Sequence, residues 1–260
     1  TVEGSFPLGA AVAASMLAAG FGPIPSFIGA AVAGMLAGVV TAILHTKMKI
    51  PALLAGILTM IALYSVNLRV MGKANLSLLG TDTTFTIIRN MFGLNSAHTT
   101  LVVGVLATVL VAVFMYWFFG TEIGAAIRAT GFNQQMIRAQ GVNTDVTIML
   151  GLLISNALVA ISGALVAQSN GFADVGMGTG TIVIGLASVI IGEVLFGTRS
   201  FKNCIISVIL GSVVYRIVIA AVLQMGMPPN DLKLFTSILV AFALAMPLIK
   251  SKFGARKVVD

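Results

Sequence analysis

The stretch TTLVVGVLATVLVAVFMYWFF (residues 99–119) decides the fold, because it holds no charged residue over the length of a membrane crossing. At about 1.5 Å of rise per residue, a helix over this run is roughly 30 Å long, which matches the hydrocarbon core of a bilayer. The whole chain of 260 residues is similar, with 58% hydrophobic and 9% charged residues. An ordinary soluble domain has about 25% charged residues. The sequence therefore predicts an all-α polytopic membrane protein.

Apolar runs between polar breaks predict about eight transmembrane helices, some of them short or broken. The expected crossings are residues 6–20, 24–44, 50–70, 99–119, 146–168, 181–196, 203–225 and 232–249. We expect residues 1–260 to form one transmembrane domain. The opening TVEGSFPLGA has neither an initiator Met nor the basic flank of a signal sequence, so we expect native sequence upstream.

Lys and Arg residues gather in the loops on one side of these crossings, and such loops stay in the cytoplasm. These loops and the basic tail, residues 250–260, hold ten of the 15 Lys and Arg residues. We therefore expect the start and the C-terminus of this chain on the cytoplasmic side. The net charge of +7 is explained by this topology, and the basic residues form no aromatic-interleaved patch that would indicate nucleic acid.

One sustained polar segment, residues 121–145, falls in a cytoplasmic loop and nearly repeats itself as IRATGFN (residues 127–133) and IRAQGVN (residues 137–143). Asn133 is a residue type that caps helices, and Gly131 and Gly141 are able to end them in the left-handed conformation. The pattern predicts a helix of about two turns over residues 134–140. Met136 and Ile137 are expected as its apolar contact points, with Arg138 beside them; an ordinary solvated loop is the alternative.

Two charged side chains, Glu193 and Arg216, fall inside the expected crossings, where charges are costly and often functional. For Arg216, with Ser212 and Ala220 one turn away on each side, both an ion pair inside the bundle and contact with a passing solute are open. For Glu193, interfacial anchoring is the alternative to a place on the translocation path. Asn156 is the third path candidate, although its spacing with small residues on the same crossing also indicates helix packing.

Catalytic and metal-binding patterns are not expected. The sequence has no phosphate-binding loop of the Walker type and no grouped Ser, His and acidic residues. Its single Cys and two His lie at no metal-ligand spacing.

At GAAIRATGFNQQMIRAQGVNTD (residues 124–145) the sequence resembles the permease subunits of bacterial ATP-binding-cassette (ABC) importers, in the branched-chain amino acid, ribose and nucleoside permease family. The resemblance continues in GLLISNALVAISGAL (residues 151–165) and TIVIGLASVIIGEVLFGTRSF (residues 181–201), and it covers nearly the whole chain. Where many relatives have a Gly-Gly turn, this chain has GEVLFGTRSF (residues 192–201), which weakens a sugar assignment. The run from residue 45 to residue 75 looks closest to tryptophan-type amino acid permeases.

The resemblance implies a non-catalytic permease in a bacterial cell membrane that forms the path for a small solute, an amino acid with an aromatic or branched side chain. In such permeases the matched loop is a coupling helix that docks in a cleft of the cytosolic ATPase. The matched positions here are Arg128, Gly131, Asn133, Arg138, Gly141 and Asn143. The implied partners are that ATPase, which binds ATP and Mg, a second permease copy in a homodimer, and an external substrate-binding protein. The chain itself is expected to bind no cofactor. A sugar or nucleoside permease, an ion-coupled secondary transporter and a structural membrane protein are the alternatives.

Overall fold

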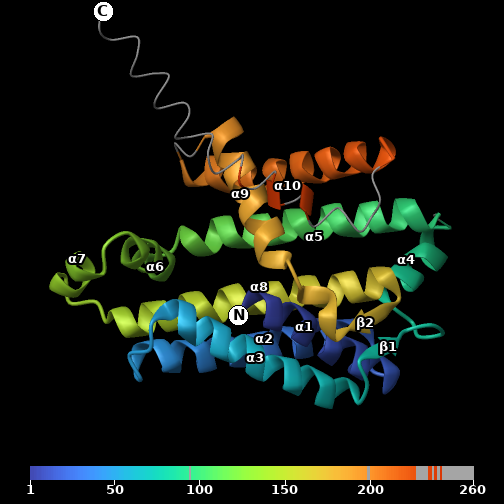
Figure 1. Ribbon diagram of the computed structural model, residues 1–260, viewed down its shortest axis with the longest axis horizontal. Helices are drawn as coiled ribbons and strands as arrows, with labels where there is room; N and C mark the ends of the chain where they lie inside the picture. The colour runs from blue at the N-terminus through green and yellow to red at the C-terminus, as the bar shows by residue number, and fades with distance from the viewer. Residues whose placement is uncertain (94, 198–199, 227–233, 236, 239–240, 242–260) are drawn as a thin grey trace, which may run out of the picture. The chain divides into compact units, whose positions relative to one another are not determined.

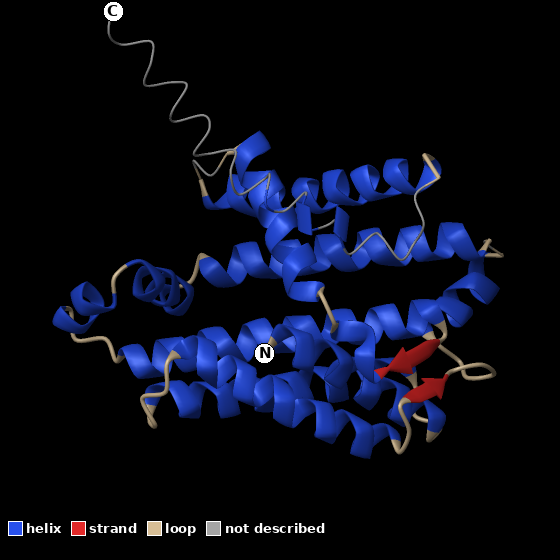
Figure 2. Ribbon diagram, in the orientation of Figure 1, coloured by secondary structure: helices blue, strands red, loops and turns tan. Residues whose placement is uncertain are grey.

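The structure, a computed structural model, describes the chain except for residue 94 and residues 198–199, 227–233, 236, 239–240 and 242–260 (Figure 1). The chain forms two compact units, Thr1–Thr179 and Gly180–Asp260. Helices make up nearly all of the described secondary structure, and the described strands form one short two-stranded sheet (Figure 2). The prediction of an all-α polytopic protein is therefore confirmed, whereas a single domain over residues 1–260 stays a prediction.

The first unit contains eight α-helices, two strands and a short 3-10 helix among its described residues. Its α-helices are α1 (Val2–Ala18), α2 (Pro23–Thr46), α3 (Ala52–Met71), α4 (Thr84–Phe92), α5 (Ser96–Phe119), α6 (Glu122–Phe132), α7 (Gln134–Ala139) and α8 (Thr144–Asn170). Its other elements are β1 (Asn75–Ser77), β2 (Phe172–Asp174) and the 3-10 helix η1 (Val175–Gly178). In the second unit, α9 (Thr181–Phe196) packs against α10 (Phe201–Gln224).

Among the described residues, six helical segments are long and apolar enough to cross a membrane. They are Pro23–Thr46, Ala52–Met71, Ser96–Phe119, Thr144–Asn170, Val175–Phe196 and Phe201–Gln224. These segments match six of the eight expected crossings. The first expected crossing corresponds to α1, a shorter apolar helix of 17 residues with Pro7 inside it. The eighth, residues 232–249, falls almost entirely outside the described residues.

The core of the first unit lies where α1, α2 and α8 approach each other through small residues. A Cβ atom added at Gly34 of α2 would lie 2.6 Å from the Cβ atom of Ala160 in α8, closer than real side chains approach. One added at Gly38 would lie 2.6 Å from the carbonyl oxygen of Leu152. Residues at four-residue spacing along α2 are all buried, namely Ala30, Gly34, Gly38 and Ala42. Close helix packing, rather than a pore lining, is therefore the role of this stripe.

The C-terminal end of α8 is held by the small sheet and by hydrogen bonds to the Gln168 side chain. β1 pairs with β2 in antiparallel fashion, with Leu76 opposite Ala173. Gln168 Oε1 accepts hydrogen bonds from the Thr84 backbone N–H at 2.9 Å and from the Thr84 hydroxyl at 2.8 Å. The start of α4 is thereby fixed to α8, the longest described helix.

Candidate functional site

The polar segment between α5 and α8 folds as two short helices that are started by side-chain caps. The Thr121 hydroxyl accepts a hydrogen bond from the Gly124 N–H at 3.3 Å at the start of α6. Asn133 Oδ1 accepts one from the Met136 N–H at 3.1 Å at the start of α7. The predicted two-turn helix over residues 134–140 is confirmed as α7, and so is its Asn133 cap.

The two glycines of the near-repeat behave differently. Gly141 follows α7 with a φ of 85°, the left-handed conformation that was expected of it. Gly131 lies inside α6, so the expectation that it ends a helix is wrong. The reason is Asn133, whose φ of −155° and ψ of 101° are extended. Because a capping residue adopts this non-helical conformation, α6 ends there without a left-handed glycine.

Of three large apolar side chains around the start of α7, Ile137 is buried and Phe132 and Met136 are exposed. Ile137 is only 4% exposed, so the expectation that it is an exposed apolar contact point is wrong, whereas its coupling role stays a prediction. Met136 is 48% exposed, as expected of a contact point, and its role stays a prediction. Phe132, which the sequence reasoning missed, is 91% exposed at the corner between α6 and α7. The Asn133 cap was the available signal, because a helix that ends just before a cap leaves its last side chain at a corner.

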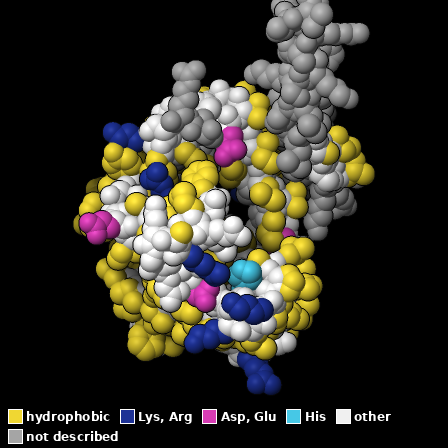
Figure 3. Space-filling model, turned by 90° about the vertical axis from the view of Figure 1, so that its left-hand side faces the viewer, with side chains coloured by type: hydrophobic (Ala, Val, Ile, Leu, Met, Phe, Trp, Pro, Cys, Tyr) yellow, Lys and Arg dark blue, Asp and Glu magenta, His cyan; other side chains and the backbone are white. Residues whose placement is uncertain are grey.

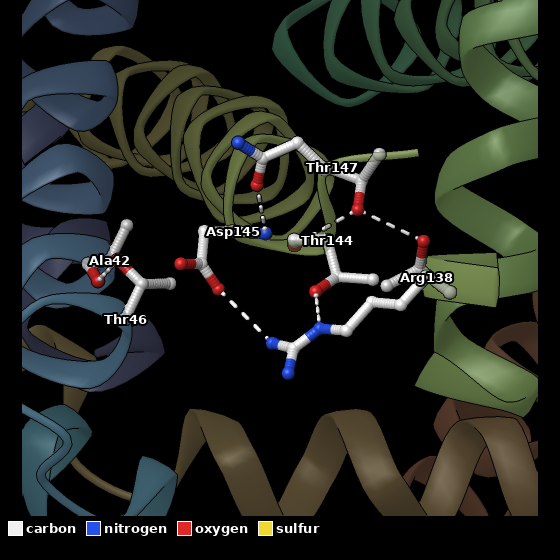
Figure 4. Close-up of polar contacts among 8 residues, drawn as sticks. Ala42, Thr46, Arg138, Thr144, Asp145 and Thr147 are labelled. Atoms are coloured by element: carbon white, nitrogen blue, oxygen red, sulfur yellow. Dashed lines mark hydrogen bonds and ion pairs between the residues drawn. The ribbon is translucent and has the colours of Figure 1, made fainter. Parts of the chain in front are cut away.

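Arg138 makes its contacts within the chain (Figure 4). Its Nε–H donates to the hydroxyl of Thr144, the first residue of α8. One of its terminal nitrogens lies 3.4 Å from a carboxylate oxygen of Asp145, the next residue along α8. The guanidinium therefore ties the C-terminal end of α7 to the first turn of α8.

A second link joins α6 to the same turn of α8. The hydroxyls of Thr130 and Thr147 lie 2.9 Å apart in a buried hydrogen bond, and Thr147 also donates to the backbone carbonyl of Thr144 at 3.0 Å. Asn143 caps α8 by accepting from the Asp145 N–H at 3.0 Å. Arg128 contacts a preceding element instead, since it donates to the backbone carbonyl of Phe119 at 3.4 Å.

Basic side chains gather at the end of the first unit that carries α6 and α7. Figure 3 faces this end and shows Lys and Arg side chains, beside one His, among hydrophobic ones. Because α2 runs antiparallel to α8, its C-terminal end lies near the start of α8. The exposed basic residues of this end are therefore Lys47, Lys49, Arg128 and Arg138.

Asn156 lies in a helix interface and is 2% exposed. Its Oδ1 accepts a hydrogen bond from the Ser5 hydroxyl at 2.7 Å, and its Nδ2 donates to the Leu152 carbonyl at 2.8 Å. The bond with Ser5 joins α1 to α8, and the bond with Leu152 lies within α8. Packing is therefore its observed role, and a place on the translocation path stays a prediction.

Glu193 and Arg216 are both exposed in the second unit. There α9 and α10 approach through a different set of residues, namely Ser188, Gly192, Ser207, Gly211 and Tyr215, all of them buried. Arg216 is thus not part of the contact between α9 and α10. An ion pair of Arg216 inside the bundle, and the path roles of both residues, stay predictions.

In the described part of the chain, no three His, Cys, Asp or Glu side chains group in a way that would hold a metal ion. What the described residues of this end show is a short capped helix with exposed apolar side chains, beside basic side chains.

These features define a class, the polytopic helical membrane proteins with a structured polar loop. A family model described as "Branched-chain amino acid transport system / permease component" matches residues 2–245. The chain belongs to this family, and it is the membrane-spanning permease subunit of an ABC transporter. Permeases of this kind work with an ATPase and a substrate-binding protein.

Two curated relatives cover nearly the whole chain. A "tyrosine transport system permease protein" of Clostridioides difficile (strain R20291) is 39% identical over 245 residues, which are 94% of this chain and 80% of the relative. An uncharacterized protein of Rickettsia prowazekii (strain Madrid E) is 34% identical over 254 residues, which are 94% of this chain and 86% of the relative. No solved structure matches the chain.

Proposed function

We propose that this permease imports an amino acid with an aromatic side chain, powered by a separate ATPase. The observation that carries the substrate class is the 39% identity to the tyrosine transport permease over 94% of the chain. The resemblance of residues 45–75 to tryptophan-type permeases supports the same class. The sequence GEVLFGTRSF (residues 192–201), where many relatives have a Gly-Gly turn, weighs against a sugar as the solute.

Uptake into proteoliposomes tests the substrate class. The permease is reconstituted with its ATPase and binding protein, ATP is enclosed with the ATPase, and labelled tyrosine is supplied on the other side. We expect ATP-dependent uptake that unlabelled tryptophan or phenylalanine suppresses and ribose does not. Suppression by ribose or adenosine, with none by aromatic amino acids, would overturn the assignment in favour of a sugar or nucleoside.

The α6–α7 segment is the proposed docking element for the ATPase. Phe132 and Met136 supply apolar surface, and the caps at Thr121 and Asn133 hold both helices in place. Large aromatic side chains at the centre of an interface contribute most of its binding energy. Phe132 is therefore the anchor of this surface, with Met136 beside it.

This role requires the α6–α7 end to face the cytoplasm, and the basic residues of that end support the orientation. Reporter domains fused after Lys49 or at Asn133 are expected inside the cell, and reporters near Asp82 or Asp174 outside. A reporter after Lys252 is also expected inside, although Lys252 lies outside the described residues. An external signal at Asn133 would overturn both the orientation and the ATPase contact.

The permease is proposed to act as a homodimer, with Arg216 of α10 near the contact between copies. An exposed guanidinium in the middle of an apolar span is costly against lipid, and a protein neighbour removes that cost. Cys204 is the native cysteine, so a Cys204→Ser chain provides a clean background. In that background, Arg216→Cys is expected to form a disulfide-linked dimer in membranes under mild oxidation. If no disulfide-linked dimer forms although an independent assay shows that two copies associate, Arg216 lies away from the contact.

A further inference from the structure

We infer that Arg138 is a positioning residue, which sets the angle of α7 on α8 and does not contact the ATPase. This inference rests on the proposed function of the α6–α7 segment and deepens it. It reverses the assignment that the sequence resemblance gives to Arg138. What points to it is the direction of the side chain, which reaches back to the first two residues of α8 (Figure 4).

The geometry uses both sides of the guanidinium. Nε–H donates to the Thr144 hydroxyl, and a terminal nitrogen lies 3.4 Å from Asp145. Thr144 is only 1% exposed, so it is a fixed acceptor inside the structure. A lone ion pair at half-exposed side chains contributes little, but an Arg fork that binds two neighbouring groups also fixes direction. Arg138 therefore fixes the orientation of α7 relative to the first turn of α8.

Other contacts make α7 and the first turn of α8 one unit. Ile137, next to Arg138, is buried, and the Gly141 turn that follows α7 is set in the left-handed conformation. The Thr130–Thr147 hydrogen bond holds α6 to the same turn. Rotation of α7 by the ATPase is thus transmitted to α8.

From that turn, α8 runs on into the core of the first unit. Midway it is bonded to Ser5 of α1 through Asn156, and near its far end Gln168 holds Thr84. The contacts of Arg138 with the start of α8 can therefore convert a movement of α7 into a movement of the bundle.

The inference is tested by a double-mutant cycle on the complex of permease and ATPase in proteoliposomes. The variants are Arg138→Gln, Asp145→Asn and the double variant, with Lys47→Gln as the control for losing one positive charge on the same end. Two quantities are measured: the stimulation of ATP hydrolysis by substrate-loaded binding protein, and the affinity of the permease for its ATPase. Coupling between sites is typically worth a factor of about five to 150.

We expect Arg138→Gln to lose about tenfold in stimulation and Asp145→Asn to lose less, because Asp145→Asn leaves the Thr144 contact in place, while the affinity of each variant for the ATPase stays within about threefold of wild type. The double variant should lose no more than Arg138→Gln alone, because Arg138→Gln already removes the contact with Asp145. Lys47→Gln should retain full stimulation. Arg138→Lys, which keeps the charge but not the fork, should resemble Arg138→Gln.

Two results would overturn the inference. One is a loss of ATPase affinity in Arg138→Gln that Asp145→Asn does not share, since Arg138 would then contact the ATPase. The other is normal stimulation in both single variants. Failure of the proposed function is recognised separately: the wild-type permease would then show no stimulation by loaded binding protein, before any variant is compared.

Discussion

The two halves of the near-repeat, residues 127–133 and residues 137–143, agree at five of seven positions and yet fold differently. Their final asparagines do the same work, since Asn133 caps α7 and Asn143 caps α8. The residues before them diverge. In the first half the chain continues as helix up to Phe132, whereas in the second half the helix stops at Ala139 and turns through Gly141.

The difference shows which properties are local and which are set by the surrounding structure. A cap depends only on the capping residue and the two or three N–H groups that follow it, so asparagine caps the next helix in both halves. Burial depends on what lies opposite each residue, and both α6 and α7 contact α8. In the first half Thr130 is buried and Phe132 is exposed, whereas the second half is anchored through Ile137 and Arg138.

The largest expected effect is the difference in stability between a variant with a charge at the buried Ile137 and one with a charge at the exposed Phe132. Ile137→Asp buries an unpaired carboxylate between α7 and α8, and we expect it to destabilise the folded segment by about 3 to 5 kcal/mol. Phe132→Asp, its matched control, should leave the unfolding temperature in detergent unchanged, because Phe132 is 91% exposed. Equal unfolding temperatures for the two variants would contradict the burial of Ile137.

Alanine substitution of the two glycines is expected to have smaller effects on stability, of opposite sign at Gly141 and Gly131. Gly141→Ala forces a side chain into a φ of 85° and should destabilise the segment by about 1 to 2 kcal/mol. Gly131→Ala, inside α6 with nothing within 4 Å of the added Cβ atom, should stabilise it by about 0.5 to 1 kcal/mol. Thermal unfolding of the purified permease measures both. A destabilising Gly131→Ala would mean that α6 ends earlier than Phe132.

The smallest effect tests what the two halves share. Asn133→Ala and Asn143→Ala each remove one cap, at a cost of about 1 kcal/mol. Amide hydrogen exchange should rise about fivefold at Met136 in the first variant and at Asp145 in the second. Serine at either position should restore most of the protection, and a serine variant as fast as alanine would contradict capping.

Much of this molecule was readable from its sequence. Long uncharged runs such as residues 99–119 predict spans directly, because the bilayer sets their length. Asn133 and Gly141 were also predicted correctly, since turn chemistry acts over a few residues. The burial of Ile137 was not predicted, because the sequence does not show whether an isoleucine in a polar segment contacts a partner or the same chain. For Asn156, likewise, the sequence does not show the hydrogen-bond partner Ser5, whose hydroxyl lies 2.7 Å away.

We propose above all that the α6–α7 segment binds the ATPase through Phe132. The affinity of the purified permease for its ATPase, compared between wild type and Phe132→Asp in the same detergent, tests this contact. Loss of a central aromatic anchor costs about 2 kcal/mol or more, so we expect at least about 30-fold weaker binding with an unchanged unfolding temperature. Wild-type affinity in Phe132→Asp would show that Phe132 does not hold the ATPase.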